Sequence, residues 1–452
     1  MKPDFFDLET LREDYDIEFK SGEGKDGNGC LPKCIWETYS AMANTEGGLI
    51  FLGIKELKGK DFEFVGVKNY HKIIGDLWNV LNNAEKVSCN LLKNSDVESF
   101  EHQEVHLIRI RVPQANRKQR PVYINGNPLK GTFRRNNDGD YRCSEDIVKQ
   151  MLGDQSNDTR DGVLIEGFGL DDINMTTFQV FRQHFVNRKP NHPFNDCNDQ
   201  DFLRSIGGWG KNRDSKQESL TLAGLLMFGK LRSILDAVPN YIVDYQEFSR
   251  TPAENRWIDR ITSDFTWSGN LYDFYRLAIN KLYEGLKVPF LLSGDERIDD
   301  TPVHEALREA LVNTIVHADY SGTCSILIVK RPDLFGFRNP GLLRVPLNEA
   351  LRGGVSDCRN RNLQKMFQLI GLGEQAGSGV PKIYKNWDAQ HWKKPELEER
   401  FESNQTVLVL RMTSLLPENV VAYLKETLGK TFEELDQLER IALVTAKAEG
   451  CV

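Results

Sequence analysis

A helix stop followed directly by an apolar run is the feature that most constrains the fold of this chain. The sequence Asn44-Thr-Glu-Gly-Gly48 ends a segment that starts at Pro32, and Leu49-Ile-Phe-Leu-Gly-Ile54 follows at once. Proline suits the first position of a helix, and glycine is the residue that most often ends one. A continuous apolar run is typical of a strand that is buried on both faces. The two elements together predict an α/β domain.

The flanking sequence extends this domain over residues 1–152. Between positions 105 and 112, isoleucines alternate with Arg109 and Arg111, which is the period of a half-buried strand. The same reasoning predicts four further groups of elements, namely strands over 15–19 and within 121–135 and helices over 71–85 and 144–151.

The rest of the chain divides into three parts. Residues 160–298 predict a middle connecting α/β region, 299–413 a second α/β block, and 414–452 a charged helical end. The middle region is expected to hold three helices and a strand, over 172–186, 219–231, 270–286 and 241–248. A chain of 452 residues is long enough for two to four domains. The expected fold class is therefore α/β (α+β) and multidomain.

Charge is distributed unevenly along the chain. The net charge is −8, yet the segment from Ile108 to Gln150 has ten Lys or Arg against four Asp or Glu. This excludes a uniformly basic coat for nucleic acid but leaves room for a local basic face. No uncharged apolar run reaches the about 18 residues that a membrane-spanning helix needs. The eight cysteines are scattered, and Cys30 and Cys34 lack a second pair to complete a zinc site. We expect reduced thiols in a cytoplasmic protein that has no membrane partner.

The basic segment contains side chains suited to nucleic acid. Its cationic residues crowd around Tyr123 and Phe133, and they are Arg117, Lys118, Arg120, Lys130, Arg134 and Arg135. Phosphate backbones need such charge, and exposed aromatic rings can stack on unpaired bases. The pattern predicts a face that binds DNA or RNA. The alternative is a solvated basic edge with both rings in the core.

Three carboxylates stand near the expected ends of neighbouring strands. Glu13 and Glu18 flank the first strand, with Lys20 on the same face as Glu18, and Glu56 follows the 49–54 strand. Carboxylates in such positions can hold a divalent metal, Mg²⁺ or Mn²⁺, against a phosphodiester. Acids at strand ends are also ordinary solvated groups, so spacing alone leaves both interpretations open.

A resemblance to a known family adds to this pattern. The motif Glu13-x4-Glu18-Phe-Lys20, together with the signature SAMANTEGGLIFLGI, resembles the Schlafen/AlbA-like DNA-binding domain over roughly residues 8–150. In the Schlafen nucleases, three acids cut structured RNA with a divalent metal. The resemblance implies Glu13 and Glu18 as two of them, and Glu56 stands where the family has Asp. Many bacterial relatives are considered DNA-binding modules, so the resemblance implies nucleic-acid binding, with nuclease activity as the alternative.

A polar stripe on a predicted helix marks the second candidate site. Thr301 and Pro302 suit the cap and the first position of this helix. Four polar residues then recur every four positions along one face, namely Glu305, Glu309, Asn313 and His317. A solvated helix face would show the same stripe. Further along, Gly377-Ser-Gly379 opens a helix whose free N–H groups and dipole suit a phosphate.

These segments resemble a family of ATP-binding folds. The sequences HEALREALVNTIVHADYS, FRNPGLL and RNRNLQKMFQLIGLGEQAGSGVPKI resemble the Bergerat-type fold of the GHKL superfamily (gyrase, Hsp90, histidine kinases and MutL) over about residues 300–412. The closest likeness is the divergent branch in RecG-like transcriptional regulators. The resemblance implies that Glu309 activates water and that Asn313 ligates Mg²⁺. ATP and Mg²⁺ are therefore the implied cofactors.

The same resemblance implies how the nucleotide is held. Asn339 and Gly341 match the box in which the family's Asp accepts a hydrogen bond from the adenine amino group, and Asn can still accept through its carbonyl oxygen. Gly377 and Gly379 match the phosphate loop. The resemblance implies binding of ATP more directly than its hydrolysis, because Asn339 stands where the family has Asp.

The last segment and the remaining alternatives complete the prediction. Residues 414–452 resemble the start of a winged-helix domain. The first hypothesis is a nucleotide-regulated nucleic-acid-binding protein, either a transcriptional regulator or a phage-defence protein. The second is a metal-dependent nuclease gated by ATP, and the third is a non-catalytic oligomeric scaffold. A homo-oligomer is expected, and a RecG-type helicase is disfavoured because the sequence has no Walker A motif.

Overall fold

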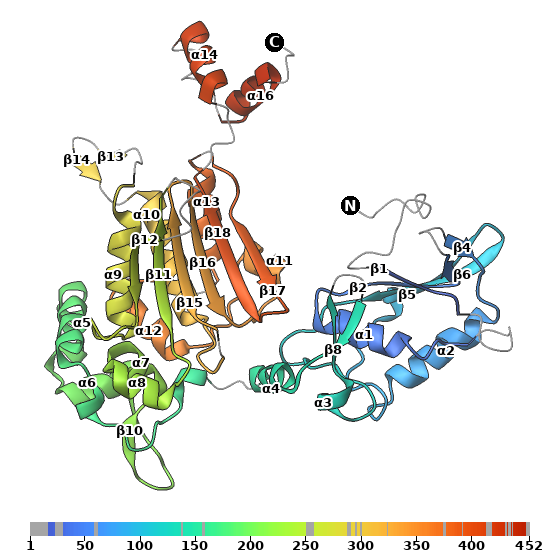
Figure 1. Ribbon diagram of the computed structural model, residues 1–452, viewed down its shortest axis with the longest axis horizontal. Helices are drawn as coiled ribbons and strands as arrows, with labels where there is room; N and C mark the ends of the chain where they lie inside the picture. The colour runs from blue at the N-terminus through green and yellow to red at the C-terminus, as the bar shows by residue number, and fades with distance from the viewer. Residues whose placement is uncertain are drawn as a thin grey trace. The chain divides into compact units, whose positions relative to one another are not determined.

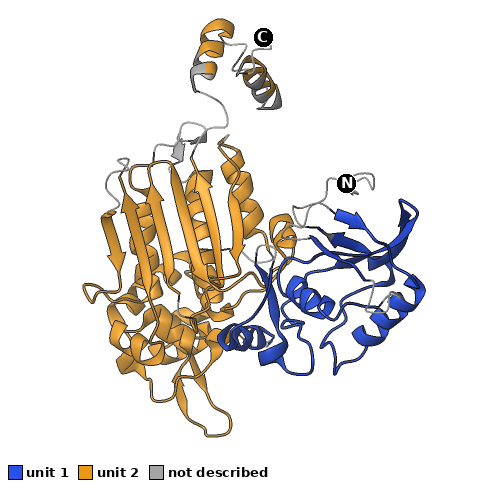
Figure 2. Cartoon of the chain, turned by 45° about the vertical axis from the view of Figure 1, so that its right-hand side comes forward, with its two compact units in different colours: residues 1–157 blue, residues 158–452 orange. Residues whose placement is uncertain are grey.

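The chain forms two compact units in a computed structural model. The described residues are 17–22, 30–57, 62–136, 139–155, 159–249, 257–286, 291–293, 296–298, 301–322, 324–373, 377–390, 392–412, 418–429, 432, 435 and 437–448. Unit 1 comprises residues 1–157 and unit 2 comprises residues 158–452 (Figure 2).

Unit 1 is built on a four-stranded mixed sheet (Figure 1). The strand order is β1-β2-β6-β5, with the bounds Ile17–Lys20, Gly48–Leu52, Val105–Val112 and Val97–His102. β1 and β2 run parallel, and the other pairs are antiparallel. On β2, Ile50 and Leu52 join the core formed with α1 (Ile35–Asn44) and α2 (Tyr70–Leu81). Phe51 belongs to a second cluster, so the apolar run is buried on both faces, as the sequence predicts.

Asn44 explains why the signature at the end of α1 is needed. Its side chain is fully buried, and its Nδ2 donates hydrogen bonds to the carbonyl oxygens of Val122 (2.8 Å) and Phe133 (3.0 Å). Its Oδ1 accepts one from the backbone N–H of Val122 at 2.8 Å. Gly47 then turns the chain with φ +86°, where a Cβ would lie 2.7 Å from the carbonyl oxygen of Val112. The signature thus joins helix, sheet and basic segment into one core.

The remaining elements of unit 1 are short. They are β3 (Ile54–Glu56), β4 (Phe62–Phe64), η1 (Asn94–Asp96), α3 (Pro128–Gly131), β7 (Phe133–Asn136), β8 (Gly139–Arg142) and α4 (Glu145–Asp154). β3 pairs with β4, and β7 with β8. The prediction of two strands within 121–135 is wrong in part, because only β7 forms a strand there. Its partner β8 follows it along the chain, and Tyr123 and Ile124 make isolated bridges instead.

Unit 2 is organised around a six-stranded sheet. The order is β12-β11-β15-β16-β18-β17, with the bounds Trp257–Thr262, Val243–Phe248, Ile326–Arg331, Leu334–Pro340, Gln405–Arg411 and Glu396–Arg400. β11 pairs with β15 in parallel, and every other pair in this sheet is antiparallel. The sheet therefore takes two of its strands from before residue 298 and four from after it.

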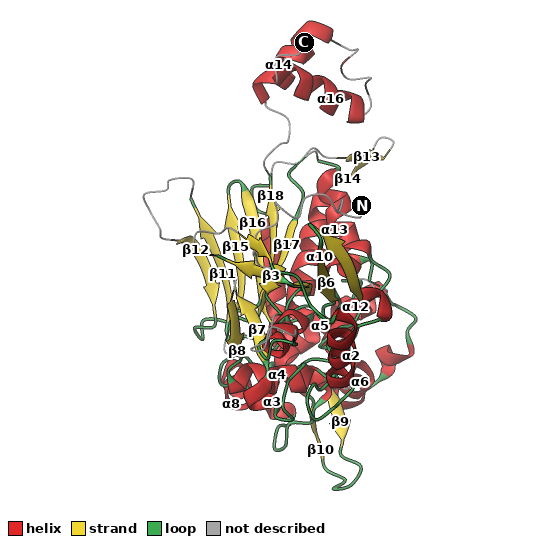
Figure 3. Cartoon of the chain, turned by 90° about the vertical axis from the view of Figure 1, so that its right-hand side faces the viewer, coloured by secondary structure: helices red, strands yellow, loops and turns green. Residues whose placement is uncertain are grey.

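Helices cover one face of this sheet (Figure 3). They include α9 (Leu271–Tyr283), α10 (Pro302–Val316), α12 (Arg361–Leu369) and α13 (Gly379–Asp388). Alternate strand residues such as Ile328, Phe335 and Phe337 are buried in the same core as α10. α10 begins as the sequence predicts, with Thr301 as its N-cap and Pro302 at its first position.

The other elements of unit 2 surround this layer. They are η2 (Arg160–Gly162), η3 (Leu170–Asp172), α5 (Met175–Arg188), η4 (Pro193–Asp196), α6 (Asp199–Ile206), β9 (Trp209–Lys211), β10 (Glu218–Leu220), α7 (Leu222–Phe228), α8 (Leu231–Ala237), β13 (Leu291–Ser293), β14 (Glu296–Ile298), α11 (Leu347–Arg352), α14 (Glu418–Leu428) and α16 (Gln437–Ala448). The helix predicted over 219–231 is two helices, because the chain is extended at Gly229. A Cβ there would lie 2.3 Å from the carbonyl oxygen of Leu225. No helix among the described residues is long and apolar enough to cross a membrane.

The first described residues of unit 2 hold the start of α12. The buried carboxylate of Asp161 accepts a hydrogen bond from the backbone N–H of Leu363 at 2.8 Å. The hydroxyl of Thr159 accepts one from the backbone N–H of Arg361 at 3.1 Å. These acceptors satisfy amide groups that the first turn of a helix cannot satisfy itself. The beginning of unit 2 is thus fastened to the helix that precedes the Gly377–Gly379 loop.

Candidate nucleotide pocket and nucleic-acid interface

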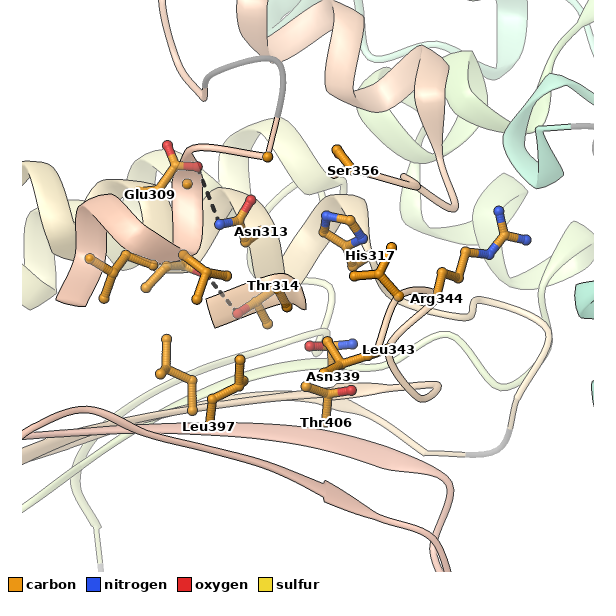
Figure 4. Close-up of a pocket in the computed structure, with 18 of the residues that line it drawn as sticks. Glu309, Asn313, Thr314, His317, Asn339, Leu343, Arg344, Ser356, Leu397 and Thr406 are labelled. Atoms are coloured by element: carbon orange, nitrogen blue, oxygen red, sulfur yellow. Dashed lines mark hydrogen bonds between the residues drawn. The ribbon is translucent and has the colours of Figure 1, made fainter. Parts of the chain in front are cut away.

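A cavity lies between α10 and the strands β16, β17 and β18 (Figure 4). It holds about 1030 Å³ of atom-free space, including its open mouth. Every residue assigned to the nucleotide site except Gly341 lines it, namely Glu309, Asn313, Asn339, Gly377 and Gly379. The structure therefore brings segments together that are up to 70 residues apart in the sequence.

Three of the four residues in the polar stripe line this cavity. Glu309, Asn313 and His317 line the cavity. Glu305 binds α13 instead, with Lys382 Nζ at 3.4 Å and an Nδ2–H···O hydrogen bond from Asn386 at 3.2 Å. The stripe is thus a cavity wall for most of its length, and its first member joins two helices.

An acid and an amide meet beneath the glycine loop. Asn313 Nδ2 donates a hydrogen bond to Glu309 Oε1 at 3.2 Å (Figure 4). A Cβ on Gly379 would lie 2.2 Å from that oxygen and 3.0 Å from Asn313 Nδ2. Only glycine lets the loop pass this close. The N-terminus of α13, which is the positive end of its helix dipole, therefore starts directly beside the pair.

A second loop lies against the glycine loop. Gly377 has φ +70°, and a Cβ there would lie 2.4 Å from the carbonyl oxygen of Val355. The backbone N–H of Gly354 donates to the carbonyl oxygen of Gly377 at 3.3 Å. The positive φ is a conformation that glycine adopts without strain. Both glycines of the predicted phosphate loop are thus required by local geometry.

Asn339 lies deep in the cavity and is 8% exposed. Its Nδ2 donates to the carbonyl oxygen of Pro340 at 3.2 Å, which leaves Oδ1 to act as an acceptor. Beside it, the hydroxyl of Thr406 donates to the carbonyl oxygen of Gly341 at 2.8 Å. A buried acceptor of this kind suits an exocyclic amino group of a base.

Gly341 serves a structural purpose at the base of the cavity. It has φ +93°, and a Cβ there would lie 2.3 Å from Arg359 Nη1. The Arg359 guanidinium, which is 2% exposed, donates to the carbonyl oxygens of His317 and Leu342. Arg359 therefore closes the C-terminal end of α10, and its buried contacts leave it no route to a phosphate.

His317 caps the C-terminal end of α10 as a neutral, half-buried imidazole. Burial lowers its pKa to about 4, and the neighbouring guanidinium groups of Arg359 and Arg344 contribute to this shift. The cavity wall therefore presents an uncharged hydrogen-bonding ring at neutral pH.

This imidazole makes the stability of unit 2 depend on pH. At pH values between about 4, the pKa of His317 in the folded protein, and its ordinary value of 6.5, His317 binds a proton in the unfolded chain but not in the folded one. The free energy of unfolding should therefore fall by about 2 kcal/mol through His317 as the pH drops from about 7.5 to about 5. Urea denaturation of the wild type and of His317→Asn at both pH values measures how much of the change in the free energy of unfolding is due to His317. Equal pH slopes in the two proteins would contradict it.

The three acids predicted in unit 1 are only partly described. Glu13 lies outside the described residues, and Glu56 is placed at the end of β3 without a described side chain. Glu18 lies between two cations, with Lys20 Nζ at 2.7 Å and Arg135 Nη1 at 2.9 Å. Among the described residues, no group of three His, Cys, Asp or Glu side chains could hold a metal ion. The metal site formed by Glu13, Glu18 and Glu56 stays a prediction.

The basic residues predicted to bind nucleic acid differ in exposure. Lys118 and Lys130 are exposed. Lys20 pairs with Glu18, and Arg117 and Arg120 are partly exposed with hydrogen bonds to the carbonyl oxygens of Asp154 (2.6 Å) and Ala115 (2.8 Å). This leaves the two lysines as the freest cations of the predicted set to reach a phosphate.

Arg134 and Arg135 differ from their predicted surface position, whereas the ring of Phe133 lies in the core, the alternative that the sequence left open. They are 8%, 2% and 7% exposed, because β7 lies against α1. Arg135 also forms an ion pair with Asp140 at 3.1 Å. These side chains stabilise the fold of unit 1, and they are not placed to contact a phosphate backbone.

Two residues that sequence reasoning missed lie on β8. Tyr141 is 59% exposed, and Arg142 beside it is exposed as well. The sequence Asn136-Asn-Asp-Gly139 is a signal for the hairpin turn that presents them. An exposed ring can stack on a base, and an exposed guanidinium can bind a phosphate. As consecutive residues of a strand, the two side chains point to opposite faces of it.

Comparisons with known families agree with this geometry. Residues 13–144 match the family described as "Schlafen, AlbA_2", and residues 326–410 match "Putative ATP-dependent DNA helicase recG C-terminal". The chain joins a Schlafen AlbA_2 domain to a RecG-type C-terminal ATPase-like domain. Between them, residues 149–244 match a domain of unknown function (DUF8451). The AlbA_2 and RecG-type domains associate the chain with nucleic acid and with ATP.

Two solved structures align with parts of the chain. The DIP2311 protein from Corynebacterium diphtheriae aligns over 91% of this chain and 78% of its own, with 17% identity and a TM-score of 0.45. The N-terminal domain of a RecG-related protein from Nitrosomonas europaea aligns over 30% of this chain and 88% of its own, with 25% identity and a TM-score of 0.23. No curated protein matches the chain. The match to the RecG-type domain begins after α10, so Glu309 and Asn313 lie outside it.

Proposed function

We propose that this protein binds nucleic acid under the control of a nucleotide, as a transcriptional regulator or a phage-defence protein does. The observation that carries the proposal is the Glu309–Asn313 pair directly beneath Gly379, at the start of a helix and in the wall of a cavity. A helix N-terminus attracts phosphate, and an acid–amide pair beside it suits a hydrated divalent cation.

The side chains of the cavity define how ATP would bind. The oxygen of Asn313 would ligate Mg²⁺ or Mn²⁺, and the N–H groups that follow Gly377 and Gly379 would hold the phosphates. Asn339 Oδ1 would accept a hydrogen bond from the adenine amino group. Glu309, which is 6% exposed, would orient a water molecule if the nucleotide is hydrolysed.

The AlbA_2 domain would supply the nucleic-acid contact. Tyr141, Arg142, Lys118 and Lys130 combine an exposed ring with exposed cations. This set suits a single strand or an unpaired loop, because stacking needs a base that is free of its partner. Phosphate contacts would make the affinity fall with salt.

One binding experiment tests both halves of the proposal. Fluorescence anisotropy with labelled single-stranded RNA, single-stranded DNA and duplex DNA is measured with and without MgATP. We expect the affinity of the wild type to change at least about fivefold on adding MgATP, which corresponds to a coupling energy of about 1 kcal/mol. Gly379→Ala should remove the response, because its methyl group displaces the Glu309 carboxylate from Asn313. Tyr141→Ala should weaken binding about tenfold with or without ATP.

Matched controls make the outcome decisive. Gly336→Ala adds the same methyl group on β16, where its nearest neighbour would lie 3.6 Å away, so it should respond to MgATP as the wild type does. If MgATP left the affinity of the wild type for nucleic acid unchanged, nucleotide control would be excluded. Cleavage of the labelled strands with Mn²⁺, lost in Glu18→Ala, would favour the metal-dependent nuclease instead. If the protein bound no nucleic acid, the non-catalytic oligomeric scaffold would be the remaining hypothesis.

A further inference from the structure

A second cavity lies on the other side of α10. It is formed by α5, α9, α10 and the residues that follow α12, and it holds about 690 Å³ of atom-free space including its mouth. Among the residues that the structure describes, none lines both this cavity and the nucleotide pocket. Arg308 lines it, next in sequence to Glu309 of the nucleotide pocket.

The walls of this cavity are aromatic and apolar. The side chains of Tyr272, Tyr275, Ile279 and Ile370 line it, and each is less than 9% exposed. Tyr275 is held by an edge contact with Phe367 at 5.3 Å between ring centroids. Fixed rings of this kind offer a surface for another planar ring at little cost in side-chain entropy.

The rim is cationic. It includes His184, Arg276 and Arg308, and the lining residues that the structure describes include no carboxylate. Arg188 lies beside it, because a Cβ on Gly371 would be 2.7 Å from Arg188 Nε. Arg276 Nη1 lies 3.3 Å from Asp273 Oδ1, but this carboxylate also accepts hydrogen bonds from Thr177 and Ser268. The rim therefore presents three basic side chains, one of which is paired with Asp273.

His184 lies at the same rim and responds to the charge of Arg276. Its ring nitrogen Nδ1 is 2.6 Å from the hydroxyl oxygen of Tyr272, which fixes the imidazole at the rim. Burial lowers the pKa of His184, and the charge of Arg276 contributes to the shift. The imidazole thus experiences a positive field that an anion would reverse.

We propose that this cavity is a binding site for a small aromatic anion, a planar ring that carries a phosphate or carboxylate group. The ring would lie against Tyr275 and Ile279, and the anionic group would accept hydrogen bonds from Arg276 at the rim. This site is distinct from the nucleotide pocket, and its existence does not depend on the function proposed above.

Phenyl phosphate is the probe that tests the site, with inorganic phosphate and phenol as its two halves. The full-length protein is labelled with ¹³C in its histidine rings, and the signal of His184 is assigned through His184→Asn. An anion beside an imidazole favours the protonated form, so phenyl phosphate should raise the pKa of His184. Phosphate and phenol alone should each bind at least about tenfold more weakly, because each makes only part of the contacts.

Two arginine variants decide which charge is responsible. Arg276→Gln should weaken phenyl phosphate binding at least about tenfold, through loss of a charged hydrogen bond. Arg232→Gln removes an exposed arginine of α8 that pairs with Asp236 in the same way, and it should bind as the wild type does. Arg276→Gln alone should also raise the pKa of His184, because a neighbouring positive charge is removed.

Three outcomes would each contradict a different part of this proposal. No change in the His184 titration at millimolar phenyl phosphate would overturn the site. Equal affinity in the wild type and Arg276→Gln would overturn the placement of the anion. Inorganic phosphate that binds as tightly as phenyl phosphate would overturn the role of the aromatic wall.

Discussion

Replacing Arg359 with alanine is expected to destabilise unit 2 by about 3–5 kcal/mol, the usual cost of removing one partner from a buried charged network. The guanidinium is 2% exposed and donates to the carbonyl oxygens of His317 and Leu342. Its charge also lowers the pKa of the buried Asp319 against the effect of burial, together with that of Arg160. The alanine variant would leave two buried carbonyls unsatisfied and a cavity behind Gly341.

A neighbour provides the control for this prediction. Arg361 stands two residues further along the chain, at the start of α12, and its side chain is 57% exposed. Arg361→Ala should change the free energy of unfolding by less than about 1 kcal/mol, as surface ion pairs do. Urea denaturation followed by tryptophan fluorescence measures both variants. Similar losses in the two would contradict the structural role of Arg359.

Replacing Arg135 with alanine is expected to destabilise unit 1 by about 3 kcal/mol or more. Arg135 lies between the carboxylates of Glu18 (2.9 Å) and Asp140 (3.1 Å), and it donates to the carbonyl oxygen of Ile17 at 3.0 Å. Its removal would leave two largely buried carboxylates without the cation that bridges them. We therefore expect a loss of folded protein, measured by the midpoint of thermal unfolding.

Lys130 separates this structural role from nucleic-acid binding. Lys130→Ala removes an exposed cation from the same basic segment, so it should leave the unfolding midpoint unchanged and weaken nucleic-acid binding through one lost phosphate contact. If Arg135→Ala kept the wild-type midpoint and lost affinity instead, Arg135 would belong to the binding face after all.

Local signals in the sequence predicted much of the fold. The start of α10 is encoded by Thr301 and Pro302, and the end of α1 by the glycines at 47 and 48, so both could be placed from nearby residues alone. The fold classes of both domains were also predictable, because their motifs combine several such signals. The convergence of Glu309, Asn313, Asn339 and the glycine loop on one cavity follows from the resemblance to the GHKL fold.

Contacts between distant residues could not be predicted in the same way. Arg135 has its partner Glu18 at the other end of the domain sequence, so periodicity near position 135 does not reveal its burial. The pairing of β11 with β15 joins segments about 80 residues apart, and strand order of this kind depends on the whole fold. The exposure of Tyr141 depends on the pairing of β8 with β7, which the local sequence pattern around position 141 does not indicate.

The shared sheet of unit 2 has a practical consequence for dividing this protein into fragments. A piece that started at residue 299 would lack β11 and β12, so the edge of β15 would be open to pairing with other chains. It would also lack Thr159 and Asp161, which satisfy the first amides of α12. A soluble fragment that retains the nucleotide pocket therefore has to begin before residue 159, even though every residue assigned to that pocket comes after residue 300.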